Sequence, residues 1–113
     1  MKTIAMVTGG SRGIGRAICL KLAELGFHVL VNYLSNEIEA KNTLDMIQDQ
    51  GGSGELIPFD VSSPADVQKA LEGWKKDNEN EYIQVLVNNA GIRKDNLMVF
   101  MDDTDWQKVL EIS

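Results

Sequence analysis

The chain alternates between short apolar runs and longer segments in which apolar residues recur with the period of a helix. The apolar runs predict four buried strands, over Thr3–Thr8, Val29–Tyr33, Glu55–Asp60 and Gln84–Asn88. The periodic segments predict four helices, over Gly13–Leu25 and Asn36–Gln50, from Ser63, and from Thr104 to Ser113. Strand and helix in alternation indicate βαβ units with right-handed crossovers. The expected fold class is therefore α/β, a doubly wound, Rossmann-like parallel sheet comprising the first four βα units of one domain.

Local signals mark the ends of several predicted elements. Asn36 is expected to cap the second helix, because Glu39 follows three residues later, and Gly26 is expected to end the first. Ser63 with a proline directly after it predicts the start of the third helix. Pro58 cannot donate a ladder hydrogen bond, which favours an edge position for the third strand.

Composition narrows the class of protein. The 113 residues are 43% hydrophobic and 25% charged, as in one soluble globular domain. The net charge of −6 argues against a nucleic-acid or anionic-membrane partner, whose phosphates it repels. The single cysteine, Cys19, predicts a packed thiol in a reducing, cytoplasmic setting, and the apolar start of the chain is too short for a signal peptide or membrane span. No metal site is expected, and His28 is expected to lie at the surface.

The sharpest chemical signal is the glycine-rich segment between the first strand and the first helix, Thr8-Gly9-Gly10-Ser11-Arg12-Gly13-Ile14-Gly15. A pyrophosphate binds where backbone N–H groups and a helix N-terminus face it. Gly9 permits a tight turn, Gly13 permits a close backbone approach, and Gly15 permits close packing of helix on strand. Such a turn can also be a simple connector, although the strand–turn–helix context favours a phosphate site.

A second signal follows the fourth strand, where the chain reads Asn88-Asn89-Ala90-Gly91. Ligands of doubly wound sheets bind beyond the carboxyl ends of the strands, near the point where the strand order reverses. If the first and fourth strands are neighbours, both loops face one crevice. Asp60 and Val61 follow the third strand on the same side, where Asp60 could accept a hydrogen bond from an adenine amino group.

Three motifs together resemble the short-chain dehydrogenases/reductases: T-G-x-x-x-G-I-G at residues 8–15, Asp60-Val61, and N-N-A-G at residues 88–91. The segment from Gly91 to Met98 is most similar to that of the β-ketoacyl-acyl-carrier-protein reductases. This resemblance implies NADPH-dependent reduction of a 3-oxoacyl thioester on acyl carrier protein to the 3-hydroxyacyl form, in fatty-acid biosynthesis. It also implies a cytoplasmic homotetramer for the full-length protein.

The resemblance assigns cofactor roles to individual residues. Gly9, Ser11, Arg12 and Ile14 are expected to line the pyrophosphate and the adenosine ribose, with Gly13 and Gly15 shaping the turn. Asp60 and Val61 are expected to hold the adenine. Asn89, Ala90 and Gly91 are expected to pass beneath the adenine-side ribose, and Asn88 to tie neighbouring strands together.

The choice between NAD and NADP can be argued from charge. An acid at the end of the second strand would accept hydrogen bonds from the ribose 2′-OH and repel a 2′-phosphate. The segment 32–35 at this place contains no acid, whereas Arg12 offers a cation and Ser35 a hydroxyl. NADP(H) is therefore the expected cofactor. Glu37 could serve NAD instead, but its position favours the first turn of the second helix.

No catalytic residue is identified in this chain. The family uses a tyrosine with a lysine four residues later, whereas Tyr33 and Tyr82 are followed at that distance by Glu37 and Leu86. Ser113 occupies the position of a common proton-relay asparagine. Residues 1–113 are therefore expected to form the NADP(H)-binding amino-terminal part of one Rossmann-like domain, without the catalytic part and without turnover. The alternatives are a short-chain reductase of another alcohol or ketone, or a non-catalytic dinucleotide-binding or interaction module whose fourth strand pairs with a partner along an exposed edge.

Overall fold

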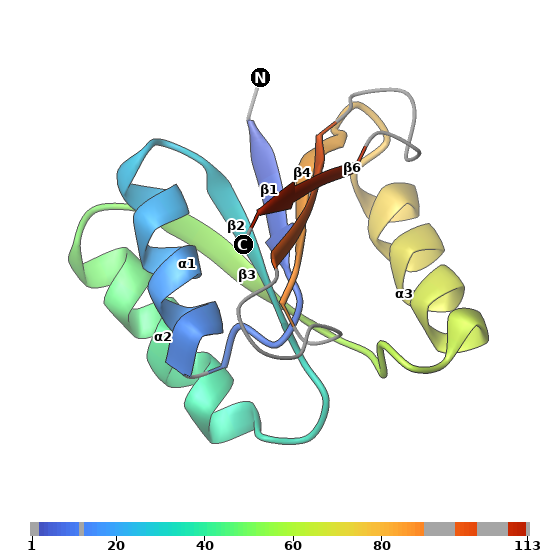
Figure 1. The fold of residues 1–113 in the computed structure, drawn as a ribbon, viewed down its shortest axis with the longest axis horizontal. Coiled ribbons are helices and arrows are strands. Elements are labelled where there is room, and N and C mark those ends of the chain that lie inside the picture. The colour runs from blue at the N-terminus through green and yellow to red at the C-terminus, as the bar shows by residue number, and fades with distance from the viewer. Residues whose placement is uncertain (1–2, 12, 90–96, 102–108, 113) are drawn as a thin grey trace.

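The computed structural model describes residues 3–11, 13–89, 97–101 and 109–112. Within these ranges, the strands form one sheet in the order β3-β2-β1-β4-β5-β6 (Figure 1). They span Ile4–Val7 (β1), His28–Tyr33 (β2), Ser53–Pro58 (β3), Ile83–Asn88 (β4), Leu97–Met101 (β5) and Val109–Ile112 (β6). β3, β2, β1 and β4 are parallel to one another, which confirms the predicted parallel sheet. β5 and β6 continue the sheet in antiparallel pairing.

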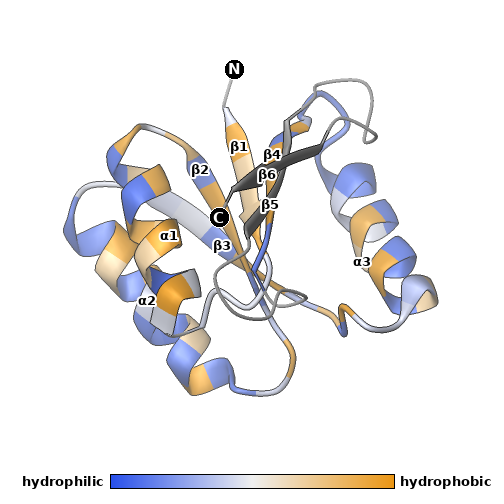
Figure 2. Cartoon of the chain, in the orientation of Figure 1, coloured by the Kyte–Doolittle hydropathy of each residue, from blue (hydrophilic) through white to orange (hydrophobic). Residues whose placement is uncertain are grey.

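The helices cover both faces of the parallel strands. α1 (Gly13–Glu24) and α2 (Glu37–Asp49) lie together on one face, and α3 (Pro64–Asp77) lies on the other (Figure 1). Alternate residues of β1 and β2 point to opposite faces, so Met6 and Leu30 pack with Trp74 of α3, whereas Val29 and Val31 pack with the α1 residue Cys19. Hydrophilic and hydrophobic residues alternate along each helix, as expected for helices with one side on the sheet and the other in solvent (Figure 2).

The predicted helix ends are confirmed in detail. Asn36 caps α2 by accepting a hydrogen bond from the Glu39 N–H at 3.2 Å, and Ser63 caps α3 through the Asp66 N–H at 3.2 Å. Gly26 has a φ of 98° after α1, where the Phe27 N–H donates to the Leu22 carbonyl at 3.0 Å. This is the six-to-one bond that closes a helix with a left-handed residue.

β3 is an edge strand, as Pro58 predicted, although it begins and ends two residues earlier than expected. Pro58 pairs in register with Tyr33, and the next residue, Phe59, donates its N–H to the Tyr33 carbonyl at 3.1 Å. Successive backbone groups of a strand point to opposite sides, so the missing N–H of Pro58 faces the open edge of the sheet. The proline therefore leaves the ladder intact.

Two expectations for the last quarter of the chain are wrong. The helix predicted from Thr104 to Ser113 is replaced, where the chain is described, by β6; residues 104–108 and 113 lie outside the described residues. Valine and isoleucine suit a strand, and backbone pairing with β5 replaces the hydrogen bonds of a helix. The exposed edge expected on β4 is also absent, because β5 pairs with it from Val85 to Asn88. The edge that favoured a non-catalytic interaction module is therefore occupied by the chain itself.

Two further side chains test the interpretation of isolated residues. His28 is buried rather than on the surface, because its ring lies between β3 residues: Nδ1 is 2.9 Å from Ser53 Oγ and Nε2 is 3.1 Å from Glu55 Oε2. The Cys19 thiol is fully buried, and this burial raises its pKa to about 12, which confirms a packed thiol. No helix in the described part of the chain is long and apolar enough to cross a bilayer.

Candidate functional site

The glycine-rich loop leaves the carboxyl end of β1 and enters α1 in a conformation that only glycine adopts easily. Gly9 and Gly13 have φ values of 65° and 64°. The Gly9 N–H donates to Asn32 Oδ1 at 3.2 Å, and the Gly10 N–H donates to the Asn32 carbonyl at 3.0 Å. The first turn of the loop is thus fixed to β2, and Gly13 leaves open space where a side chain would stand.

Gly15 allows the first turn of α1 to lie directly on this loop. A Cβ atom on Gly15 would stand 2.0 Å from the Gly9 carbonyl oxygen and 2.8 Å from Asn89 Nδ2. No real Cβ approaches a backbone oxygen so closely, so the close approach of helix and loop requires glycine at this position.

The loop after β4 meets the glycine-rich loop, as expected if β1 and β4 are neighbours. Thr8 Oγ1 donates to Asn88 Oδ1 at 3.1 Å, and Asn89 Nδ2 donates to the Gly9 carbonyl at 3.3 Å. The Thr8 N–H also donates to the Val87 carbonyl at 3.0 Å. Hydrogen bonds therefore join the carboxyl ends of β1 and β4 at the place where the strand order reverses.

Asn32 joins the glycine-rich loop to the end of β3 and was not singled out as a site residue by the sequence. Its side chain is almost completely buried, and Nδ2 donates to the carbonyls of Ile57 and Phe59 at 3.1 and 3.2 Å. Because Oδ1 accepts from Gly9, one amide joins the glycine-rich loop to β3 across β2. The available signal was a polar residue at an inward position of an otherwise apolar strand.

Asp60 follows β3 and presents a carboxylate that is held in its ionised form. Hydrogen bonds from Ser62 Oγ at 2.6 Å and from the Ser62 N–H at 2.9 Å lower the pKa of Asp60 below its usual range. The Asp60 N–H donates to Asp66 Oδ2 at 2.6 Å, which ties this turn to α3. Asp60 can therefore act at neutral pH as a hydrogen-bond acceptor with a fixed backbone.

The other predicted residues lie around the same end of the sheet. Ile14 is 69% exposed, and Ser35 and Val61 are also exposed. Glu37 lies in the first turn of α2, as interpreted from the sequence, where it forms an ion pair with Lys41 at 3.6 Å.

The structure brings together the following predicted cofactor residues at the carboxyl ends of β1 to β4: Gly9, Ser11, Gly13, Ile14, Gly15, Ser35, Asp60, Val61, Asn88 and Asn89. Arg12, Ala90, Gly91 and Ser113 lie outside the described residues. Among the described residues, no group of three or more His, Cys, Asp or Glu side chains is arranged to hold a metal ion.

Comparison with known proteins places these features in a family. Residues 3–113 match the family model described as short chain dehydrogenase. The chain is 38% identical over 113 residues to the 3-oxoacyl-[acyl-carrier-protein] reductase FabG of Staphylococcus epidermidis, covering 98% of the chain and 45% of that protein. It is 40% identical over 108 residues to FabG of Salmonella typhimurium, covering 96% and 42%. The chain thus spans less than half the length of these curated relatives.

Solved structures with similar folds are ketoreductases and related oxidoreductases. The angucycline C-6 ketoreductase LanV with bound NADP is 36% identical, with a TM-score of 0.71 over 80% of this chain and 37% of LanV. A metagenomic short-chain oxidoreductase in complex with NADP is 34% identical, also with a TM-score of 0.71, over 80% of this chain and 39% of the other.

Proposed function

Because this chain belongs to the short-chain dehydrogenase family, we propose that it is the NADP(H)-binding part of a reductase that converts a 3-oxoacyl thioester on acyl carrier protein to the 3-hydroxyacyl form. The contact of the glycine-rich loop with the loop after β4 is the observation that carries this proposal. Two loops joined at Gly9 and Asn89, at the reversal of strand order, form the type of crevice in which such sheets bind dinucleotides. The similarity to FabG supports the substrate class.

The residues present fit a dinucleotide. The space beside Gly13 allows a phosphate to approach the backbone at the start of α1, where the helix dipole favours negative charge. We assign the pyrophosphate and adenosine ribose to Gly9, Ser11, Arg12 and Ile14, and the adenine to Asp60 and Val61. We assign the adenine-side ribose also to Asn89, Ala90 and Gly91. The bound cofactor supplies the hydride for carbonyl reduction.

The charges around α2 support NADP(H) over NAD(H). The two acids nearest the end of β2 are both paired with cations, Glu37 with Lys41 at 3.6 Å and Glu39 with Arg16 at 3.3 Å. A 2′-phosphate near the exposed Ser35 is therefore repelled less than it would be if these two acids had no cationic partners. LanV and the metagenomic oxidoreductase were solved with NADP.

Hydride transfer requires residues beyond those identified in this chain. Neither Tyr33 nor Tyr82 has a lysine four residues later, so we assign the tyrosine acid to the part of the relatives' length that this chain does not span. The whole protein is proposed to act as a cytoplasmic homotetramer. In that assembly the present chain binds and orients the cofactor.

The substrate assignment can be tested by following NADPH oxidation with acetoacetyl-acyl carrier protein. The full protein proposed above, which includes the tyrosine acid, should oxidise NADPH with this thioester. It should oxidise NADPH much more slowly with a simple ketone such as cyclohexanone. The purified 113-residue chain should show no turnover, because the family's tyrosine–lysine pair is missing. Turnover by the 113-residue chain, or a full protein that prefers the simple ketone, would contradict the proposal.

A further inference from the structure

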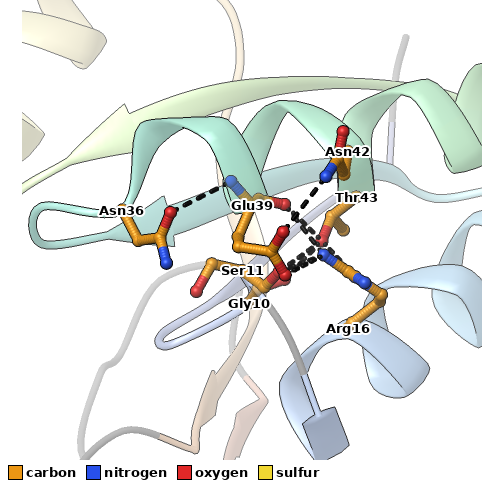
Figure 3. Close-up of polar contacts among 7 residues, drawn as sticks. All are labelled: Gly10, Ser11, Arg16, Asn36, Glu39, Asn42 and Thr43. Atoms are coloured by element: carbon orange, nitrogen blue, oxygen red, sulfur yellow. Dashed lines mark hydrogen bonds and ion pairs between the residues drawn. The ribbon is translucent and has the colours of Figure 1, made fainter.

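Arg16 of α1 connects the glycine-rich loop to α2. Its Nη2 donates to the Ser11 carbonyl at 2.6 Å and to the Glu39 carbonyl at 3.0 Å, and its Nε donates to Thr43 Oγ1 at 2.9 Å (Figure 3). The same Nη2 forms an ion pair with Glu39 Oε2 at 3.3 Å. One side chain of α1 thereby connects the loop to the first two turns of α2.

Thr43 extends this connection to the preceding peptide. Its side chain is fully buried, and Oγ1 lies 3.0 Å from both the Gly10 and the Ser11 carbonyl oxygens. Since a hydroxyl accepts and donates at once, Thr43 can accept from Arg16 and donate to a loop carbonyl. Both loop carbonyls are therefore turned toward α2.

Glu39 is itself held in place, so the ion pair has a fixed geometry. Asn42 Nδ2 donates to Glu39 Oε1 at 3.1 Å, and Asn36 caps the Glu39 N–H (Figure 3). The Arg16 and Glu39 side chains are only 20% and 34% exposed. A partly buried, hydrogen-bonded pair keeps its geometry better than a fully exposed one, which supports a structural purpose for the charge pair.

The direction of the Gly10 carbonyl sets the direction of the next N–H. A trans peptide is planar, and its C=O and N–H point in opposite directions. With the Gly10 carbonyl turned toward Thr43, the Ser11 N–H is turned away from α2. Ser11 is among the residues assigned above to the pyrophosphate and the adenosine ribose, so this N–H points to the side of the loop where that part of the cofactor is expected.

We propose that Arg16, Glu39 and Thr43 are positioning residues that orient the Gly10–Ser11 peptide for binding the phosphate-bearing adenosine half of the dinucleotide. This inference rests on the proposed function, since it assumes a dinucleotide at the loop. The three side chains act through the backbone of the loop and do not themselves contact the cofactor. Their effect should therefore appear with ligands that carry the phosphates of this half and not with adenosine, which carries none.

The test compares two adenosine ligands on the 113-residue chain by isothermal titration. Adenosine 2′,5′-bisphosphate carries the 2′- and 5′-phosphates of this half, whereas adenosine carries neither. Arg16→Ala should weaken binding of the bisphosphate by at least about tenfold, the loss expected for hydrogen bonds to a charged group. It should change binding of adenosine by less than about twofold. Arg16→Lys, which keeps the charge and part of the bonding, should recover part of the lost affinity.

Lys21→Ala is the matched control, because Lys21 is an exposed cation of the same helix, in an ion pair with Glu24 at 3.6 Å. It should leave both affinities unchanged. Equal loss of both ligands in Arg16→Ala, or unchanged bisphosphate affinity in a folded variant, overturns the inference. If Arg16→Ala does not fold, Arg16→Lys decides, because a selective loss of bisphosphate affinity is still expected and an unchanged ratio refutes it. Failure of the unsubstituted chain to bind either ligand would instead refute the proposed function.

Discussion

Replacing Gly15 with alanine is expected to destabilise the folded chain by about 3 kcal/mol or more and to abolish dinucleotide binding. The added Cβ would stand 2.0 Å from the Gly9 carbonyl oxygen and 2.8 Å from the Gly9 carbonyl carbon. Both are backbone atoms of a turn that is fixed to β2 by Asn32, so the loop cannot move aside cheaply. Urea unfolding followed by circular dichroism measures the loss of stability, and titration with NADPH measures the loss of binding.

Gly73→Ala is the control for this prediction, because it makes the same change at a glycine with free space. Gly73 lies within α3, and a Cβ there would meet nothing within 4 Å. Alanine should therefore stabilise the chain by about 0.5–1 kcal/mol through its better helix propensity. Similar unfolding midpoints for the two variants would contradict the packing described at Gly15.

The second large effect is expected at Asn32. Asn32→Leu keeps the approximate size of the side chain but removes the partners of the Gly9 N–H and of the Ile57 and Phe59 carbonyls. Each buried polar group left without a partner costs about 1–3 kcal/mol, so the variant should lose about 3 kcal/mol or more. Because the loop is released from β2, NADPH affinity should fall together with stability.

The matched control is Asn42→Leu, the same replacement at an exposed position of α2. Its amide makes one hydrogen bond, to Glu39 Oε1 at 3.1 Å. An exposed change of this kind is usually within about 0.5 kcal/mol. Equal destabilisation by both leucine variants would show that the buried amide of Asn32 contributes no more to stability than an exposed amide does.

Local patterns in the sequence were sufficient for the parallel half of the fold. The runs that became β1, β2 and β4 are apolar because parallel strands are buried on both faces, and the caps at Asn36 and Ser63 depend only on residues three positions away. β5 and β6 could not be predicted in this way. Val109–Ile112 form a strand because β5 supplies the hydrogen-bond partners, and such non-local pairing leaves no trace in the spacing of nearby residues.

In the candidate site, too, some features were predictable from the sequence and others depend on contacts that only the fold creates. The meeting of the two loops was predictable, because it follows from the neighbouring positions of β1 and β4. The roles of Asn32 and Arg16 were not, because the partners that link them to β3 and to α2 lie 23 or more residues away along the chain. A polar side chain in an apolar strand and an arginine beside a glycine-rich turn indicate that a partner exists, but only the fold shows which one.

The most direct test is calorimetric titration of the 113-residue chain with NADPH and, in parallel, with NADH. The glycine-rich loop and the ionised Asp60 predict one saturable dinucleotide site. Because the acids of α2 are paired with cations, this site should bind NADPH at least about tenfold more tightly than NADH. Absence of saturable NADPH binding by a folded chain, or tighter binding of NADH, would contradict the assignment of this chain as an NADP(H)-binding unit.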